Sequence, residues 1–170
     1  MDAEKLRATQ APLKQRYREE PGAAFTTLRA RGRLAEHVTC RVETGNAHVL
    51  AGLHPLAGGT GEAACSAEML LASLAGCAGV TMNAVATALR IELRDAAIEV
   101  EGDVDFRGTL GVSKEIPVGF QKIRVRFALD TDATEEQLAN LVRLTERYCV
   151  VFQTLAHPPE IEIARTPASR

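Results

Sequence analysis

The sequence predicts an α+β domain, and three observations support that fold class. Segments with the two-residue alternation of strands stand before and after a long uncharged helix, and a second helix follows the later strands. Hydrophobic residues make up 46% of the chain and charged residues 25%, as in soluble globular proteins. The 170 residues are enough for one domain with a sizeable core.

Charge and the first residues limit the partners and the compartment that we expect. The formal net charge is −2 and the pI is about 6.1, whereas general nucleic-acid-binding proteins are usually basic, so we expect no nucleic-acid partner. Residues 1–5 carry no apolar run of the kind found in secretory signals, so we expect a cytoplasmic chain. Its four cysteines should then stay reduced, as packing residues, metal ligands or reactive groups.

The first part of the chain is expected to form a loose helix and then two or three strands. Pro12 interrupts the helical pattern of apolar residues. Gly45 and Asn46 mark the turn of a β-hairpin, and His54 and Pro55 end it. The expected elements are a helix over residues 2–18 and strands over residues 25–33, 37–43 and 48–53.

Residues 69–89 contain no charged side chain and are long enough to be a transmembrane candidate. We reject that interpretation and expect no membrane partner, because the segment is rich in alanine, carries polar residues such as Ser73 and Asn83, and lacks flanking aromatic residues. A helix with small apolar faces all round is expected to be buried by protein on most sides. Arg90 is expected to close it.

Two strands with oppositely charged faces follow the helix. Residues 98–106 alternate between apolar and acidic residues, and residues 122–129 alternate between apolar and basic ones, which predicts antiparallel neighbours joined by cross-strand charge pairs. Thr134 and Gln137 form a capping box at the start of a second helix. The remaining expected elements are that helix to about Cys149, a kinked continuation through Leu155, and a last short strand at Ile161 and Ile163.

The four cysteines have different environments. Cys77 lies midway along the uncharged helix and Cys149 lies near the end of the second helix, and each alone is most simply a buried packing residue. If both helices pack on the same sheet, the two thiols can converge and form a redox pair. Cys40 faces the apolar side of its strand and is expected to be structural. Cys65 is left open, as a loop thiol or as a contact with the site of a partner subunit.

Two stretches of the sequence carry a family resemblance. Residues 66–77, SAEMLLASLAGC, and residues 146–155, ERYCVVFQTL, resemble the two cysteine helices of the OsmC/Ohr family, the osmotically inducible and organic hydroperoxide resistance proteins. The hairpin, the glycine-rich loop after it and the order of elements from about residue 37 to residue 163 also fit. The resemblance implies an OsmC-like α+β fold, in which antiparallel sheets pack on two cysteine-bearing helices and two chains form an intertwined homodimer.

The same resemblance implies an activity. Members of this family are thiol peroxidases for organic hydroperoxides, so Cys77 would be the peroxidatic cysteine and Cys149 the resolving one. An external dithiol such as dihydrolipoamide would regenerate the pair, with no bound cofactor. We divide the chain into an N-terminal helix-and-strand extension over residues 1–35, an OsmC-like domain over residues 36–165 and a tail over residues 166–170. Residues 1–33 are more than the fold needs, and we expect this segment to wrap around the partner subunit.

The resemblance also implies groups that support the Cys77 thiolate. A free thiol has a pKa of about 8.5, and desolvation on an apolar helix raises it further, so a cation is needed nearby. The family uses an arginine held by a glutamate. In the hydroperoxide resistance branch the glutamate lies ten residues before the cysteine, and this chain has Ala67 at that position. In other branches the glutamate lies nine residues before the cysteine, and this chain has Glu68 there. The alternative for Glu68 is an acid that favours the helix dipole.

The arginine is less directly indicated by the sequence. Counting back from Pro55 over the hairpin leads to His37, and Arg33 and Arg41 lie close to it along the chain. We choose Arg41, with a solvated strand charge as its alternative interpretation. The chain also has Val150 where many members carry a proline after the second cysteine.

Other classes of function lack their motifs. There is no Cys-x₂-Cys pair and the four histidines have no ligand spacing, so no metal is expected. Nucleotide-binding glycine loops and the hydrolase nucleophile elbow are also missing from the sequence. The remaining alternative is a non-enzymatic dimer of the same fold that binds a small apolar ligand between its subunits.

Overall fold

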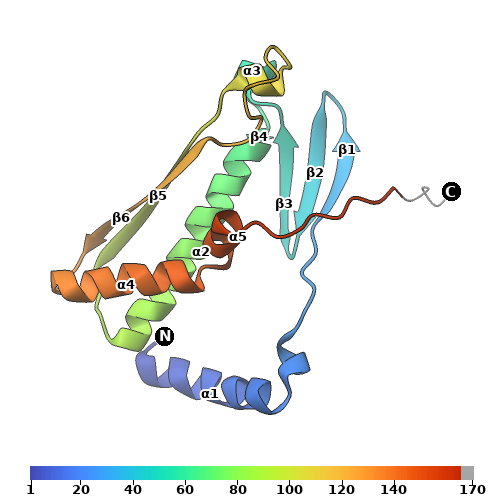
Figure 1. Cartoon of the computed structure of the whole chain (residues 1–170). Coiled ribbons are helices and arrows are strands. Elements are labelled where there is room, and N and C mark those ends of the chain that lie inside the picture. Colours follow the sequence, from blue (N-terminus) through green and yellow to red (C-terminus); the bar gives the residue numbers. More distant parts are fainter. Residues whose placement is uncertain (166–170) are drawn as a thin grey trace.

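The computed structural model describes residues 1–165, so the predicted tail at residues 166–170 lies outside the described part (Figure 1). Thirteen elements follow one another along this part of the chain. They are α1 (Ala3–Glu19), η1 (Pro21–Ala24), β1 (Arg31–Ala35), β2 (Thr39–Thr44), β3 (Ala47–Gly52), η2 (Pro55–Ala57), β4 (Ala64–Cys65), α2 (Ser66–Leu89), β5 (Asp95–Asp103), α3 (Phe106–Thr109), β6 (Lys122–Asp130), α4 (Glu135–Tyr148) and α5 (Val150–Ala156).

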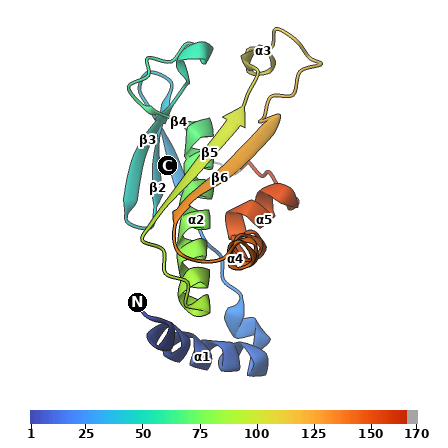
Figure 2. The same ribbon diagram turned by 90° about the vertical axis from the view of Figure 1, so that its left-hand side faces the viewer.

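The strands form two separate sheets, which confirms the predicted α+β class. The first sheet has the order β1-β2-β3-β4, with antiparallel hairpins and a parallel pairing of β3 with β4. The second sheet is the antiparallel pair of β5 and β6. Helix α2 continues directly from β4 and runs past β5 and β6, with α4 and α5 beside it (Figures 1 and 2). The predicted boundary after residue 35 falls in the turn of the β1-β2 hairpin.

The core lies between α2, the β5-β6 sheet and the pair of helices α4 and α5. Side chains four residues apart on a helix share a face, and α2 buries one such row, consisting of Leu74, Ala78, Met82 and Ala86. The apolar faces of β5 and β6 and buried residues of α4 pack on this row. The sheet therefore holds both cysteine-bearing helices, as the fold prediction required.

The expectation that α2 is buried on most sides is wrong for the single chain. Its opposite face is open, and Val80 there is 74% exposed. The reason is geometric, because α4, α5 and β5 all reach α2 from one side and α1 contacts it as well. Among the described residues, α2 alone is long and apolar enough to cross a membrane, a test that core helices also pass.

Charged residues hold β5 and β6 in register. Glu101 stands opposite Arg124, and the guanidinium of Arg124 also contacts Asp103. Arg126 binds Glu101 at 2.7 Å. These pairs confirm the predicted charge complementarity of the two strands, and they favour one register over its neighbours.

Three expected strands differ from the structure. Only the end of the segment 25–33 lies in a strand, β1, and residues 25–30 have no regular secondary structure. The strand predicted over 98–106 ends at Asp103, because Asp105 caps the short helix α3 that begins at Phe106. No strand forms at Ile161 and Ile163, where Ile163 is 94% exposed. Alternation makes a segment extended, but a strand also needs a neighbour, and none pairs with residues 157–165 within the described chain.

The N-terminal helix forms as predicted and continues through Pro12. The side chain of Asp2 caps it by accepting from the amide of Lys5 at 2.8 Å. The helix lies at the far end of α2 and buries none of its own residues (Figure 1). A contact of 4.0 Å joins Glu4 to Arg90, the residue that ends α2 in a left-handed conformation.

The second cysteine helix begins and breaks where the sequence predicted. Thr134 accepts from the amide of Gln137, and the side chain of Gln137 accepts from the amide of Thr134, so the capping box is complete. Cys149 is extended and separates α4 from α5. The predicted kink is therefore a break into two helices.

Replacing the capping hydroxyl should destabilise α4. We expect Thr134→Ala to lower the free energy of unfolding by about 1 kcal/mol, because an N-terminal amide of the helix loses its partner. Urea denaturation followed by circular dichroism measures this change. Thr134→Ser keeps the hydroxyl and should stay close to wild type, and equal losses in both variants would contradict the capping role.

Candidate active site

The structure brings the thiols of Cys77 and Cys149 together. Helix α2 contacts α5, and both cysteines belong to the same cluster around Leu74 and Ala78. The two thiols are close enough to shift each other's pKa. Cys149 is 1% exposed, whereas Cys77 is half-buried. The pair is separated along the chain but forms one site through the packing of α2 against the α4-α5 break.

The helix break places Cys149. Its amide donates to the carbonyl of Thr145 at 2.9 Å and so ends α4. Its sulfur accepts from the amide of Phe152 at 3.5 Å and so caps α5. The first amides of α5 have no partner inside the helix, and they are therefore available to sulfur atoms at this end.

The Cys77 thiol has a lowered pKa. Burial alone would raise this pKa, but backbone N–H groups of Val151 and Val150, the thiol of Cys149 and the hydroxyl of Thr81 interact with the sulfur and together lower it. Amides at a helix N-terminus stabilise a thiolate in this way. Cys77 is therefore prepared to ionise.

The Cys149 thiol is shifted in the opposite direction. Burial raises its pKa, the amides of Phe152 and Val151 oppose that shift, and the neighbouring Cys77 raises it further through its charge and hydrogen bond. The two groups titrate as a coupled pair, in which Cys77 is the more acidic thiol and Cys149 the less acidic one.

Glu68 and the candidate arginines lie away from this pair within one chain. Glu68 is exposed in the first turn of α2, and the nine residues to Cys77 correspond to about 13 Å along the helix axis. No ion pair joins Glu68 to an arginine within residues 1–165. Arg41 and Arg33 stand opposite each other on the first sheet, both exposed.

The third candidate for a cationic partner lies in the turn before β2. His37 adopts a positive φ of 55° and lines a surface cavity together with Arg41. The principal groups that act on the Cys77 sulfur come instead from α2 itself and from the α4-α5 break. Within one chain, the amides of α5 therefore occupy the role that was expected for an arginine.

The other two cysteines belong to the first sheet. Cys65 is buried in β4, paired with Gly52, and precedes α2 directly, so it is not an exposed loop thiol. Cys40 lies half-buried on β2 close to Gly32 of the neighbouring strand. Both are free thiols.

Sequence reasoning missed Thr81 and the amides of Val150 and Val151. Thr81 follows Cys77 by four residues, so helical spacing alone places both on one face. The amides carry no residue-type signal, because any non-proline residue supplies one. The sequence offered one signal for these amides, the valine at position 150. A proline there would have no N–H group to donate to the sulfur.

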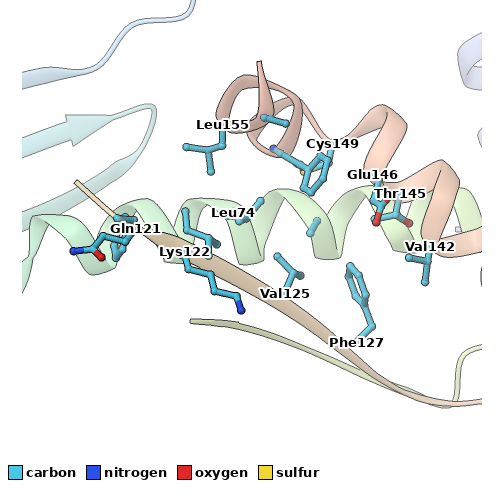
Figure 3. Close-up of a pocket in the computed structure, with 15 residues that line it drawn as sticks. Leu74, Gln121, Lys122, Val125, Phe127, Val142, Thr145, Glu146, Cys149 and Leu155 are labelled. Atoms are coloured by element: carbon cyan, nitrogen blue, oxygen red, sulfur yellow. The ribbon is translucent and has the colours of Figure 1, made fainter. Parts of the chain in front are cut away.

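A cavity of about 540 Å³ borders Cys149 (Figure 3). Apolar side chains from α2, β6, α4 and α5 form most of its wall, and its polar members are Gln121, Lys122, Thr145 and Glu146. It lies within one chain. Among the described residues, no cluster of three or more His, Cys, Asp or Glu side chains is placed to hold a metal.

Fold and site together define an α+β protein with two neighbouring thiols of unequal acidity between α2 and the α4-α5 break. Residues 59–164, more than half of the chain, match the family of OsmC-like proteins. The chain belongs to the OsmC-like protein family. No curated protein matches the sequence.

Solved structures of this family share the fold. An OsmC-like protein from Mycoplasma pneumoniae superposes with a TM-score of 0.68 at 16% identity, over 78% of this chain and 89% of its own. An organic hydroperoxide resistance protein OsmC from Legionella pneumophila gives 0.62 at 20% identity, over 79% and 92%. One from Elizabethkingia anophelis gives 0.60 at 14% identity, over 79% and 91%.

Thr81 offers a test of the thiolate environment. Thr81→Val removes a donor to the Cys77 sulfur, which should raise the pKa of Cys77 and slow its alkylation by iodoacetamide at neutral pH about three- to tenfold. Peptide mass spectrometry across a pH series measures this rate at Cys77. Thr81→Ser keeps the donor, and Thr87→Val, on the same helix, serves as control because the Thr87 hydroxyl donates to the carbonyl of Asn83. Equal rates in all variants would contradict the role of Thr81.

Proposed function

We propose that this chain is a thiol-dependent peroxidase that reduces organic hydroperoxides, with Cys77 as the peroxidatic and Cys149 as the resolving cysteine. The asymmetry of the thiol pair carries the proposal, since the pKa of Cys77 is lowered and that of Cys149 is raised. Membership of the OsmC-like family supports it, and some structural relatives are described as organic hydroperoxide resistance proteins.

The proposed reaction uses the two thiols in turn. The Cys77 thiolate attacks the terminal oxygen of the hydroperoxide, the O–O bond breaks, and the alkoxide that leaves takes a proton to become the alcohol. Cys77 is now a sulfenic acid. The sulfur of Cys149 attacks it, loses its proton, and releases water as the disulfide forms. An external dithiol such as dihydrolipoamide then reduces the disulfide, in a cytoplasm that keeps the pair reduced between turnovers.

A homodimer is part of this proposal. Part of the apolar face of the first sheet is open within the described chain, and Leu34 on it is 93% exposed. One face of α2 and residues 25–30 are likewise exposed. A second copy that intertwines with the first would cover these surfaces, and the N-terminal extension would wrap around it.

The same dimer would supply the missing cationic support. Arg41 projects from a sheet that makes few contacts with α2 in its own chain. We place Arg41, held by Glu68, beside the Cys77 thiolate across the subunit interface, where it would add to the amides of α5.

The cavity beside Cys149 favours one alternative, a non-enzymatic member of this fold that binds a small apolar ligand. A pocket of about 540 Å³ with mostly apolar walls is of the size that small-molecule sites have. The sequence analysis placed the ligand of this alternative between the subunits, whereas the cavity lies inside one chain.

Serine substitutions separate the two functions. With cumene hydroperoxide and dihydrolipoamide, Cys77→Ser should abolish turnover, because a serine hydroxyl does not ionise at neutral pH. Without the dithiol, which would itself condense with a sulfenic acid, Cys149→Ser should consume about one equivalent of hydroperoxide and leave Cys77 as a sulfenic acid that a dimedone probe traps. Cys40→Ser is the control and should retain activity. Equal hydroperoxide loss in wild type and Cys77→Ser would refute the peroxidase and leave the ligand-binding alternative.

The open face of α2 tests the dimer. Val80→Glu places a charge where the second copy would pack, so light scattering after gel filtration should show a dimer for wild type and a monomer for the variant. Lys114→Glu, in an exposed loop, should remain dimeric. A monomeric wild type, or one that partitions into lipid vesicles, would contradict this proposal.

A further inference from the structure

The turn between β1 and β2 holds two successive residues in a conformation that most side chains disfavour. His37 has a φ of 55° and Val38 has a φ of 60°. This left-handed region suits glycine, and a β-branched valine is a rare occupant of it. Val38 is 74% exposed, so burial of its side chain does not account for the conformation. Strained backbone of this kind is concentrated at binding sites.

The strained turn forms one wall of the surface cavity beside Arg41, which we call the turn cavity. Its volume is about 650 Å³. The other walls are the face of β2 and β3 that carries Arg41 and Leu50, and the loop over residues 60–63. The hydroxyl of Thr39 donates to the carbonyl of Glu36 at 2.6 Å, which ties the turn to the start of β2. The turn is therefore a fixed part of this cavity.

Two guanidinium groups share the face of the sheet that borders the turn cavity. Arg33 of β1 stands directly opposite Arg41 of β2, and residues directly opposite each other project from the same face. Like charges in this position repel each other. Neither arginine forms an ion pair within residues 1–165. A carboxylate placed between them would accept from both guanidinium groups and offset this repulsion.

Two carboxylates line the same cavity from other elements. Glu36 belongs to the turn and Glu62 to the loop. The hydroxyl of Thr60 accepts from the amide of Glu62 at 3.3 Å and lies 3.5 Å from its carboxylate, so Thr60 positions Glu62. In the described part of the chain, neither carboxylate forms an ion pair. The turn cavity thus presents both signs of charge, with no ion pair between them.

We propose that the turn cavity binds a small zwitterion, a molecule with one carboxylate and one ammonium group such as a free amino acid or a short peptide. The carboxylate lies between Arg33 and Arg41, and the ammonium group lies at Glu62. An apolar side chain of the ligand rests on Leu50. This site uses neither thiol of the Cys77 pair, so the inference goes beyond the proposed function and does not depend on it.

Calorimetric titration of the full-length protein at neutral pH tests the class of ligand. L-Leucine and leucyl-leucine carry both charges and an apolar side chain, and at least one of them should bind. The tighter of the two indicates whether the site suits an amino acid or a peptide. N-Acetyl-leucine amide carries neither charge and should bind at least about tenfold more weakly. Binding of neither zwitterion, or equal binding of N-acetyl-leucine amide, would overturn the proposal.

Two exposed side chains test the place of the ligand. Arg33→Gln and Glu62→Gln should each weaken binding of the zwitterion about tenfold, or about 1.4 kcal/mol, because each removes one charged contact. Arg31→Gln is the matched control, since Arg31 lies on the same strand and face but opposite Glu43 and two residues further from the turn. Arg41 is left unchanged, because we place it beside the thiolate of the partner subunit. Equal loss in Arg31→Gln, or no loss in the other two variants, would contradict this site.

Ligands with a single charge test the orientation of the zwitterion. N-Acetyl-leucine keeps the carboxylate alone, and leucine amide keeps the ammonium group alone. Arg33→Gln should weaken binding of N-acetyl-leucine and leave that of leucine amide unchanged, whereas Glu62→Gln should do the reverse. The opposite pattern would mean that the carboxylate does not lie between the two arginines, and the proposal would then be wrong.

Discussion

The contact between the middle of α2 and the break between α4 and α5 is the interaction on which the site depends. At this break Cys149 ends one helix and caps the next, so its sulfur and the first amides of α5 face the Cys77 thiol. A continuous helix would direct those amides to its own carbonyls. The break thus makes two chemically equal thiols unequal, and the proposed division of labour between them follows from that inequality.

The two sides of α2 differ in how much of their surface the rest of the chain buries. The second sheet, α4 and α5 all cover one side of α2, and the described part of the first sheet contacts mainly itself. Apolar residues such as Leu34 and Val80 lie exposed on the uncovered surfaces, and contiguous exposed apolar patches mark interaction sites. A second copy of the chain would account for these surfaces and for the distance of Arg41 from Cys77 in one chain. In the proposed dimer, the thiol environment would have one part built within the chain and another part from the partner.

Periodicity and turn chemistry predicted the elements whose causes are local. The hairpin around Gly45, the capping box at Thr134 and the helix stop at Arg90 all appear where their residue types indicate. The strands predicted at residues 25–33 and 161–163 were wrong where alternation found no neighbouring strand. The two cysteine helices were identified from their resemblance to a family, and the match of residues 59–164 confirms that family.

By itself the sequence determined the fold class, the two cysteine helices and the place of the helix break, because these depend on side-chain pattern and on neighbours along the chain. Only the tertiary structure decided that Thr81 and the amides of α5 act on Cys77, and that Glu68 and Arg41 do not reach it within one chain. Backbone amides look the same at every non-proline position. Their effect on a thiol depends on which helix end is packed beside it, and that is a property of the folded chain.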